Sequence, residues 1–214
     1  IHELVTELAA GLRSAGVAQD DRVTLLCDSS PNWILADAAI IAAGAVCVPR
    51  GTDVTDDDIR YIVGHSESRW AIVQKQKDRE RLLKFQSDLP ALEKIWVLED
   101  DDSELATGDN SAEELLAAGQ HALHKDSAFV IKLNAAADPG KMATIIYTSG
   151  TTGAPKGVML NQTGWLNALD RALEMKVITK KDTALSLLPP WHAFERAVEY
   201  GVMMAQCEFM ISGI

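Results

Sequence analysis

Residues 22–48 of the chain read RVTLLCDSSPNWILADAAIIAAGAVCV, and this stretch decides the fold class. Its first six residues are mostly apolar and predict a buried strand. Ser30 and Pro31 then supply an N-cap and a favoured first-turn proline for a helix that continues through Ala43. Residues 45–48 follow as the next strand. This order of strand, helix and strand, joined by short connections, is typical of a parallel crossover unit, which buries a sheet between layers of helices.

The alternation continues on both sides of this unit. Before it, Leu4, Val5, Leu8 and Leu12 fall at helical spacing, and Gly16 is a natural end for that amphipathic helix. After it, the sequence predicts a helix that opens at Thr55 and Asp58 and carries Ile59, Ile62 and Val63 on one face. A strand over 70–73, a helix around 82–83 and a strand over 95–98 follow. The remaining predictions are a surface loop over 99–110, a short helix over 112–118, a loop over 134–141 and an apolar strand over 142–147. We therefore predict an α/β fold of mostly parallel sheets flanked by helices.

The composition is that of a globular protein with an acidic surface. The chain has 214 residues, 47% of them hydrophobic, and a formal net charge of −11. This charge argues against a general affinity for nucleic acid, which needs clustered cationic residues. The acidic run 56–58 suits the positive end of a helix dipole, and we predict no metal-binding residue in the chain. Three widely spaced cysteines, Cys27, Cys47 and Cys207, are expected to be buried free thiols, which favours a reducing compartment such as the cytoplasm.

The apolar stretch over residues 33–48 is the one segment that resembles a membrane span. Asp37 lies inside it and Gly44 interrupts it near its end. A charge in the middle of a span would cost about 2.5–3.5 kcal/mol, so a buried helix followed by a strand is preferred and no transmembrane segment is predicted. Peripheral contact with a membrane stays open. No secretion signal opens the chain at Ile1, and we expect the sequence to begin inside a longer protein.

Residues 148–157, TSGTTGAPKG, follow the predicted strand over 142–147 and suit a polyphosphate ligand. Glycines let backbone N–H groups approach anionic oxygens, hydroxyls add donors, and a lysine adds a positive charge. The candidate phosphate-binding residues are Thr148, Ser149, Gly150, Thr151, Thr152, Gly153 and Lys156. The alternative is a flexible loop without a ligand, but the order and the types of the residues all point to phosphate.

The loop differs from the P-loop of common nucleotide hydrolases. That motif ends in Gly-Lys-Ser/Thr and opens into a helix. Here Pro155 precedes the lysine and Gly157 follows it, so the magnesium-binding hydroxyl is missing. Residues 158–160 then indicate a strand. The sequence therefore predicts a strand, a loop and a strand.

Residues 147–158, YTSGTTGAPKGV, resemble the signature of the adenylate-forming superfamily of acyl-CoA synthetases, luciferases and peptide-synthetase adenylation domains. Residues 42–49, AAGAVCVP, are similar to a helix-to-strand turn of these enzymes, and the following Arg50 and Gly51 resemble the long-chain fatty acyl branch. The resemblance extends over essentially the whole chain. It implies that residues 1–214 are part of the large N-terminal AMP-binding domain, with the remainder of that domain and a C-terminal domain absent.

A second constellation, residues 187–196, reads LLPPWHAFER and ends another apolar strand. It resembles the substrate-side motif of the same superfamily. The resemblance implies that His192 lies beside the acyl carboxylate or the pocket entrance, while Trp191 and Phe194 wall an apolar part; taken alone, His192 could equally be structural. Two explanations stay open for Glu195 and Arg196, an ion pair that holds the turn or a part in catalysis. For Met203 and Met204, core packing is preferred to an acyl tunnel.

The resemblance also implies a reaction. ATP and a carboxylic acid, in particular a long-chain fatty acid, would give acyl-AMP and pyrophosphate, and coenzyme A would then take the acyl group, which makes the enzyme a carbon–sulfur ligase. Lys156 and His192 are the expected catalytic residues, and a Mg²⁺ ion would be held from beyond this chain. Three alternatives stay open. The first is another enzyme of this class, with an acyl carrier protein as acceptor or an aromatic or short acid as substrate. The second is a non-catalytic nucleotide-binding protein, and the third is a purely structural or interaction protein, which leaves the phosphate loop unexplained. By itself the chain is expected to show no ATP–pyrophosphate exchange.

Overall fold

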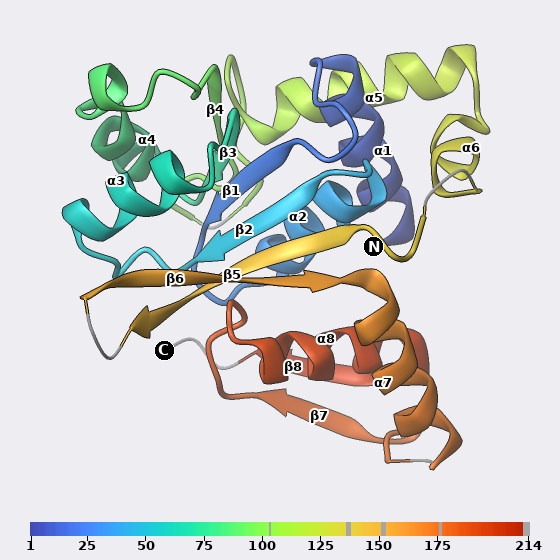
Figure 1. The fold of residues 1–214 in the computed structure, drawn as a ribbon. Coiled ribbons are helices and arrows are strands. Elements are labelled where there is room, and N and C mark those ends of the chain that lie inside the picture. The colour runs from blue at the N-terminus through green and yellow to red at the C-terminus, as the bar shows by residue number, and fades with distance from the viewer. Residues whose placement is uncertain (103, 136–137, 151–152, 176, 212–214) are drawn as a thin grey trace.

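A six-stranded sheet forms the centre of the protein, as Figure 1 shows for the computed structural model. The structure describes residues 1–102, 104–135, 138–150, 153–175 and 177–211. The strand order is β4-β3-β1-β2-β5-β6, and every neighbouring pair is parallel except the antiparallel pair β5–β6. The strands are β1 (Arg22–Leu26), β2 (Val46–Arg50), β3 (Trp70–Val73), β4 (Lys94–Val97), β5 (Met142–Gly150) and β6 (Gly153–Asn161). The predicted α/β class is confirmed.

Helices cover both faces of this sheet. One face carries α1 (His2–Ser14), α2 (Pro31–Ala42), α5 (Ala112–Lys125) and α6 (Phe129–Ala135), and the other carries α3 (Asp56–His65), α4 (Gln76–Leu83) and the short 3-10 helix η1 (Gln86–Asp88). Each face has its own cluster of buried apolar side chains. Leu12, Trp33 and Leu115 belong to the first cluster, and Ile59 and Leu82 to the second. Two separate cores therefore hold the sheet in place.

The helix starts follow the predicted caps. The hydroxyl of Ser30 accepts a hydrogen bond from the backbone N–H of Trp33 at 3.1 Å, with Pro31 in the first turn of α2. Thr55 accepts from the N–H of Asp58 at 3.1 Å at the start of α3. Each cap satisfies a backbone donor that has no partner within its own helix. The sequence therefore located both starts correctly.

Several predicted boundaries were wrong. The helix predicted over 112–118 continues to Lys125, and the loop predicted over 134–141 overlaps the end of α6. Strands β1, β2 and β4 are displaced by one or two residues from their predicted ends. Loop 99–110 was predicted as surface, yet Glu99 and Ala106 are buried. Cooperative hydrogen bonding and packing, which local sequence patterns do not encode, set these limits.

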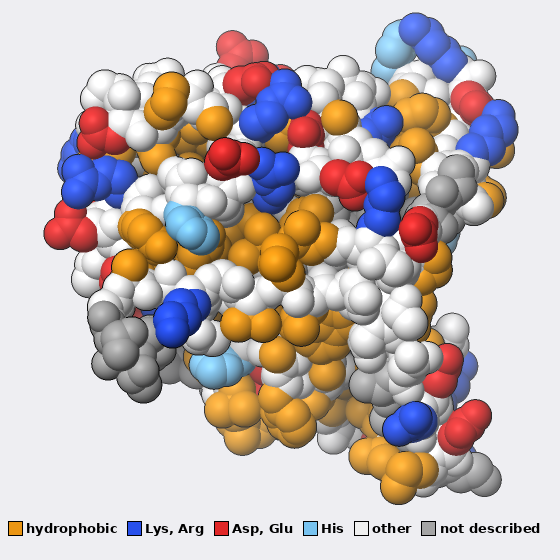
Figure 2. All heavy atoms as spheres, in the orientation of Figure 1, with side chains coloured by type: hydrophobic (Ala, Val, Ile, Leu, Met, Phe, Trp, Pro, Cys, Tyr) orange, Lys and Arg blue, Asp and Glu red, His pale blue; other side chains and the backbone are white. Residues whose placement is uncertain are grey.

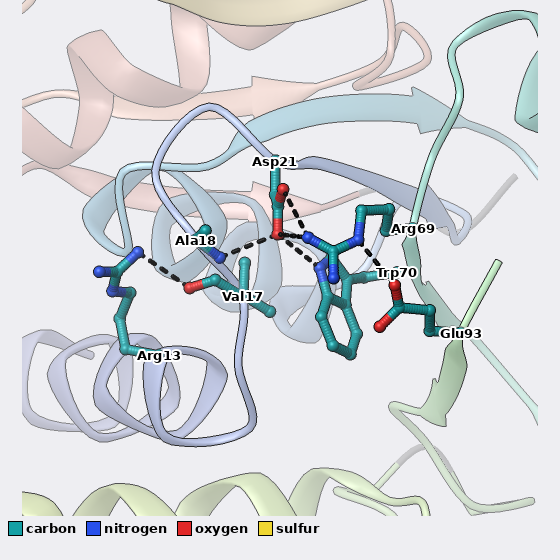
Figure 3. A network of polar contacts seen from close by, with 7 residues as sticks. All are labelled: Arg13, Val17, Ala18, Asp21, Arg69, Trp70 and Glu93. Carbon is teal, nitrogen blue, oxygen red and sulfur yellow. Dashed lines mark hydrogen bonds and ion pairs between the residues drawn. The ribbon is translucent and has the colours of Figure 1, made fainter. Parts of the chain in front are cut away.

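A network of polar contacts fixes the amino end of the sheet (Figure 3). The carboxylate of Asp21 accepts hydrogen bonds from the N–H of Ala18 at 2.9 Å, from Trp70 Nε1 at 2.8 Å and from Arg69 Nη1 at 3.2 Å. Arg69 also donates to Glu93 at 2.8 Å. The loop before β1 is thereby tied to the starts of β3 and β4.

A smaller unit lies below the sheet in Figure 1. It consists of α7 (Gln162–Glu174), α8 (Ala193–Ala205) and the parallel pair β7 (Thr183–Ser186) and β8 (Glu208–Ile211). Met203 packs against the first core cluster, as predicted, and joins α8 to the larger unit, whereas the same prediction was wrong for Met204, which is 44% exposed. No helix in the described part of the chain is long and apolar enough to cross a bilayer. Cys27 and Cys47 are buried free thiols, whereas Cys207 is half-buried.

Candidate active site

The carboxyl ends of β1 and β2 lie where two crossovers diverge. The chain leaves β1 into α2 on one face of the sheet and leaves β2 into α3 on the opposite face. In open α/β sheets, ligands bind outside the carboxyl ends of strands at such a switch point. This edge of the sheet is therefore where a ligand site is expected.

Loops at this edge are held together by polar side chains. Asp28, just after β1, accepts hydrogen bonds from the backbone N–H of Thr52 at 2.8 Å and from its hydroxyl. Arg81 of α4 donates to the carbonyl of Thr52 at 2.9 Å. Glu99, after β4, accepts from the Ser30 hydroxyl at 2.6 Å. These hydrogen bonds tie together the loops that follow β1, β2 and β4.

The predicted phosphate-binding residues lie on a β-hairpin at the same edge. Thr148 of β5 pairs with Lys156 of β6, and both side chains are exposed. Gly150 pairs with Gly153 close to the tip. Thr151 and Thr152 lie outside the described residues, and so does the side chain of Ser149. The layout of strand, loop and strand is confirmed, but the ten-residue loop was predicted too long, because cross-strand pairing extends both strands into it.

Two glycines of the hairpin are required by its geometry. Gly153 has a φ of +138°, a backbone conformation that side chains disfavour. At Gly157, an added Cβ would lie 2.8 Å from Ile145 Cγ2 and 3.2 Å from Tyr147 Cζ. The Tyr147 ring thus lies across Gly157 of the neighbouring strand. Its hydroxyl lies 2.7 Å from Nδ1 of His65, at the end of α3. Burial, with a smaller effect from a neighbouring tyrosine, raises the pKa of Tyr147 to about 12, so this ring is a neutral brace for the hairpin.

The second predicted constellation reaches the sheet through Trp191. A Cβ added to Gly51, immediately after β2, would lie 2.2 Å from the tip of the Trp191 indole, so the ring is seated on that backbone. Cys47 of β2 pairs with Thr144 of β5. The structure therefore places Trp191 at the carboxyl end of β2, which neighbours β5 in the sheet.

His192 is the N-cap residue of α8 and its side chain is exposed. Phe194, the second residue of α8, is 70% exposed and lines an apolar hollow of about 420 Å³ between α7, β7 and α8. Within the described part of the chain, the lining of this hollow includes Phe194 but not Trp191. The expectation that these two rings wall one apolar surface is therefore not met by this hollow. Met203 and Met204 line a different hollow of about 410 Å³ between α2, α7 and α8.

Sequence reasoning missed a buried cluster around Arg196. The side chains of Arg196 and Asp37 have no exposed surface and form a two-point ion pair, with Arg196 Nε 3.0 Å from Asp37 Oδ2. Arg196 Nη1 donates to the Thr144 hydroxyl at 2.6 Å, and Tyr200 donates to Asp37 at 2.6 Å. Burial alone would lower the pKa of the Arg196 guanidinium, but Asp37 and Tyr200 raise it above its ordinary value. The alternative in which Arg196 pairs with Glu195 is thus replaced by a contact between positions 159 apart.

Two further carboxylates are buried on α8. Glu195 and Glu199 are 4% and 1% exposed, and one oxygen of each has no hydrogen-bond partner among the described residues. Burial, together with the charges of Asp37 and Glu195, raises the pKa of Glu199 to about 8. The raised pKa favours the protonated form of Glu199 at neutral pH. Among the described residues, no group of three or more His, Cys, Asp and Glu could hold a metal ion.

The chain belongs to the AMP-binding enzyme family, whose model matches residues 1–213. Among curated proteins, it is 33% identical to the long-chain-fatty-acid–[acyl-carrier-protein] ligase AEE15, chloroplastic, of Arabidopsis thaliana, over 100% of this chain and 30% of that protein. It is 30% identical to the long-chain-fatty-acid–CoA ligase FadD15 of Mycobacterium tuberculosis, over 89% of this chain and 30% of that protein. The chain thus spans about 30% of the length of these relatives.

Solved structures share the fold. A long-chain-fatty-acid-CoA ligase (FadD1) from Archaeoglobus fulgidus superposes with a TM-score of 0.78 at 22% identity, over 98% of this chain and 38% of that chain. ATP-bound MatB from Rhodopseudomonas palustris superposes with a TM-score of 0.73 at 20% identity, over 98% of this chain and 39% of that chain. Both comparisons support the α/β architecture described above.

Proposed function

We propose that the whole protein containing this chain uses ATP to activate a long-chain fatty acid as acyl-AMP and then transfers the acyl group to coenzyme A. One observation carries the proposal. Thr148 and Lys156 face each other on a hairpin at the carboxyl edge of a doubly wound sheet, in a chain of the AMP-binding enzyme family. A hydroxyl and an ammonium group on a glycine-rich turn suit the terminal phosphates of a nucleotide.

In the first step, the hairpin holds the β- and γ-phosphates. An oxygen of the fatty acid carboxylate attacks the α-phosphorus, the bond to the β-phosphate oxygen breaks, and pyrophosphate leaves with that electron pair. The Lys156 ammonium offsets the charge of the departing group, and the exposed hydroxyl of Thr148 helps to orient it. Mg²⁺, when bound, would add further neutralisation, but the described residues give no reason to name a ligand for it.

In the second step, the acceptor thiol loses its proton to solvent and its sulfur attacks the acyl carbon of acyl-AMP. The bond from that carbon to the phosphate oxygen breaks, and AMP leaves with the electron pair. His192, at the start of α8, is the residue proposed to lie beside the acyl carbonyl. Two apolar features around it support an apolar acid, the Trp191 ring on Gly51 and the hollow that Phe194 lines. Figure 2 shows hydrophobic side chains gathered below the hairpin, over α8 and the segment before it, where Leu187 and Leu188 are exposed.

An acyl carrier protein is the second candidate acceptor. The observation in its favour is the 33% identity to a plant protein named as a ligase for that acceptor. Coenzyme A and a phosphopantetheine-bearing carrier protein present the same thiol, so the chemistry does not separate them. Competition between the two acceptors for preformed acyl-AMP on the full-length protein would decide.

We further propose a cytoplasmic location. Cys27 and Cys47 are buried free thiols, which suits a reducing compartment. Peripheral contact with a membrane, where long-chain acids partition, is an open part of this proposal. Fractionation of cells that produce the full-length protein, with a salt wash of the membranes, tests both parts.

ATP–pyrophosphate exchange by the full-length protein, with fatty acids of graded chain length, tests the proposed reaction. We expect Lys156→Ala to lower exchange by about 100-fold, because it removes a preorganised charge. The melting temperature should stay within about 2 °C of wild type, because the side chain is exposed. Lys181→Ala, at another exposed lysine, is the matched control. ATP binding without exchange for any acid would instead identify a non-catalytic nucleotide-binding protein.

A further inference from the structure

Arg196 lies where the two parts of the proposed site are joined. It is one turn into α8, and its backbone N–H donates to the carbonyl of His192 at 3.1 Å. Its guanidinium reaches Asp37 on α2 and the hydroxyl of Thr144 on β5. Thr144 lies four residues before Thr148 on the same strand. One side chain of the helix that follows His192 thus contacts the strand that carries the hairpin.

We propose that Arg196 is a positioning residue, which fixes His192 relative to the phosphate hairpin by binding Asp37 and Thr144. The inference rests on the proposed function and adds a residue to it. Arg196 touches no substrate in this role and acts through the orientation of α8.

The geometry of the contact supports positioning over simple packing. A guanidinium is a planar fork, and here its donors are divided between the two oxygens of Asp37, Thr144 and the hydroxyl of Tyr200. Thr144 in turn donates to the carbonyl of Cys47 at 2.7 Å. A helix that slid or rotated by one residue would leave several of these buried groups without partners. The cluster therefore accepts one placement of α8 on the sheet.

Stability alone does not account for such a cluster. Taking two charges out of water is costly, and well-packed apolar side chains of similar volume often stabilise a fold as well or better. The planar guanidinium of Arg196 adds a defined orientation of α8 relative to the sheet. Small displacements of a reacting group can lower a rate by about 100-fold, so a fixed orientation has a direct use at this position.

The test uses the full-length protein with Thr144→Val, which removes the hydroxyl at nearly constant volume, and Thr144→Ser, which keeps it as the matched control. A second variant, Asp37→Leu with Arg196→Met, removes both charges together. Ile62→Val in α3, on the other face of the sheet, controls for a general loss of stability. Two quantities are measured: amide hydrogen exchange of peptides covering residues 142–150 and 187–196, and the single-turnover rate of acyl-AMP formation.

We expect Thr144→Val and the double variant to exchange faster in both peptides and to form acyl-AMP about 10- to 100-fold more slowly, with the KM for ATP within about threefold of wild type. Thr144→Ser and Ile62→Val should resemble wild type. Unchanged exchange, a wild-type rate in the folded double variant, or an equal loss in Ile62→Val would each overturn the inference. If wild-type protein forms no acyl-AMP, the proposed function fails, and the exchange measurement still decides whether Arg196 positions α8.

Discussion

Arg69 and Arg196 are each held by carboxylates from other elements, but water reaches only one of them. The Arg69 side chain is 42% exposed between Asp21 and Glu93 at the amino end of the sheet (Figure 3). The Arg196 side chain has no exposed surface, and neither does Asp37. Both networks join segments distant in sequence. They differ in what replaces the contacts when one partner is lost.

This difference separates two uses of the same chemistry. At Arg69, solvent can take over each hydrogen bond, so the network adds little to stability. At Arg196, nothing replaces a lost partner, so the remaining charge stays buried and unpaired. The exposed network tolerates variation, whereas the buried one enforces a single arrangement. Each of the following variants tests that contrast.

The largest effect is expected from Arg196→Met alone. This change leaves the Asp37 carboxylate buried without its cation, which should lower the free energy of unfolding by about 3–5 kcal/mol. Urea unfolding of the full-length protein measures it. Adding Asp37→Leu should restore most of the loss, because the pair is then removed as a unit. A single variant as stable as wild type would show that water reaches this cluster.

Glu199→Gln should have an effect that depends on pH. The pKa of Glu199 is raised from 4.5 to about 8 in the folded protein, so the folded state keeps a proton that the unfolded chain releases. The contribution of this group to the free energy of unfolding is complete below pH 4.5. It is lost progressively as pH rises from 4.5 through 8, by at most about 1.4 kcal/mol per pH unit. The glutamine variant escapes this loss and should be more stable than wild type at pH 9, but not at pH 5. Glu174→Gln, at an exposed carboxylate, is the control, and an equal difference at both pH values would contradict the prediction.

Asp21→Asn should have the smallest effect. Burial disfavours the Asp21 carboxylate, but hydrogen bonds from Ala18 and Trp70 and the charge of Arg69 outweigh it and lower its pKa. The amide oxygen of asparagine can still accept from Ala18 or Trp70, so the loss should stay within about 1 kcal/mol at neutral pH. For wild type, the same contribution disappears as pH falls through the lowered pKa. Urea unfolding at pH 7 and pH 3 checks both statements, and a loss comparable with that of Arg196→Met would remove the contrast.

Local patterns carried most of the fold. Apolar runs such as residues 22–26 and 70–73 predicted strands, and Ser30 and Thr55 located helix starts, because each signal depends on neighbours within a few positions. The layout of the hairpin followed from the strand-forming residues on both sides of its glycines. Its extent did not, since pairing between Thr148 and Lys156 is a property of two strands together.

The candidate site was predictable only in part. Its residue types marked Lys156 and His192, but the contact of Trp191 with Gly51 joins segments that no local pattern relates. The position of Asp37 inside an apolar helix was a signal for the buried ion pair. A lone acid inside an apolar helix needs a buried partner, and Arg196 supplies it from a distant helix.

The parallel pairing of β2 with β5 has a consequence for synthesis of the chain. During synthesis, Cys47 of β2 can pair with Thr144 of β5 only after the 97 following positions have been added. At about 5–20 residues per second on the ribosome, the interval lasts about 5–20 s. Throughout it, the outer edge of β2 is open to any other strand nearby, although Pro49 removes one donor from the strand. The nascent protein is thus most prone to aggregation after four strands have emerged and before the β5–β6 hairpin arrives to close that edge.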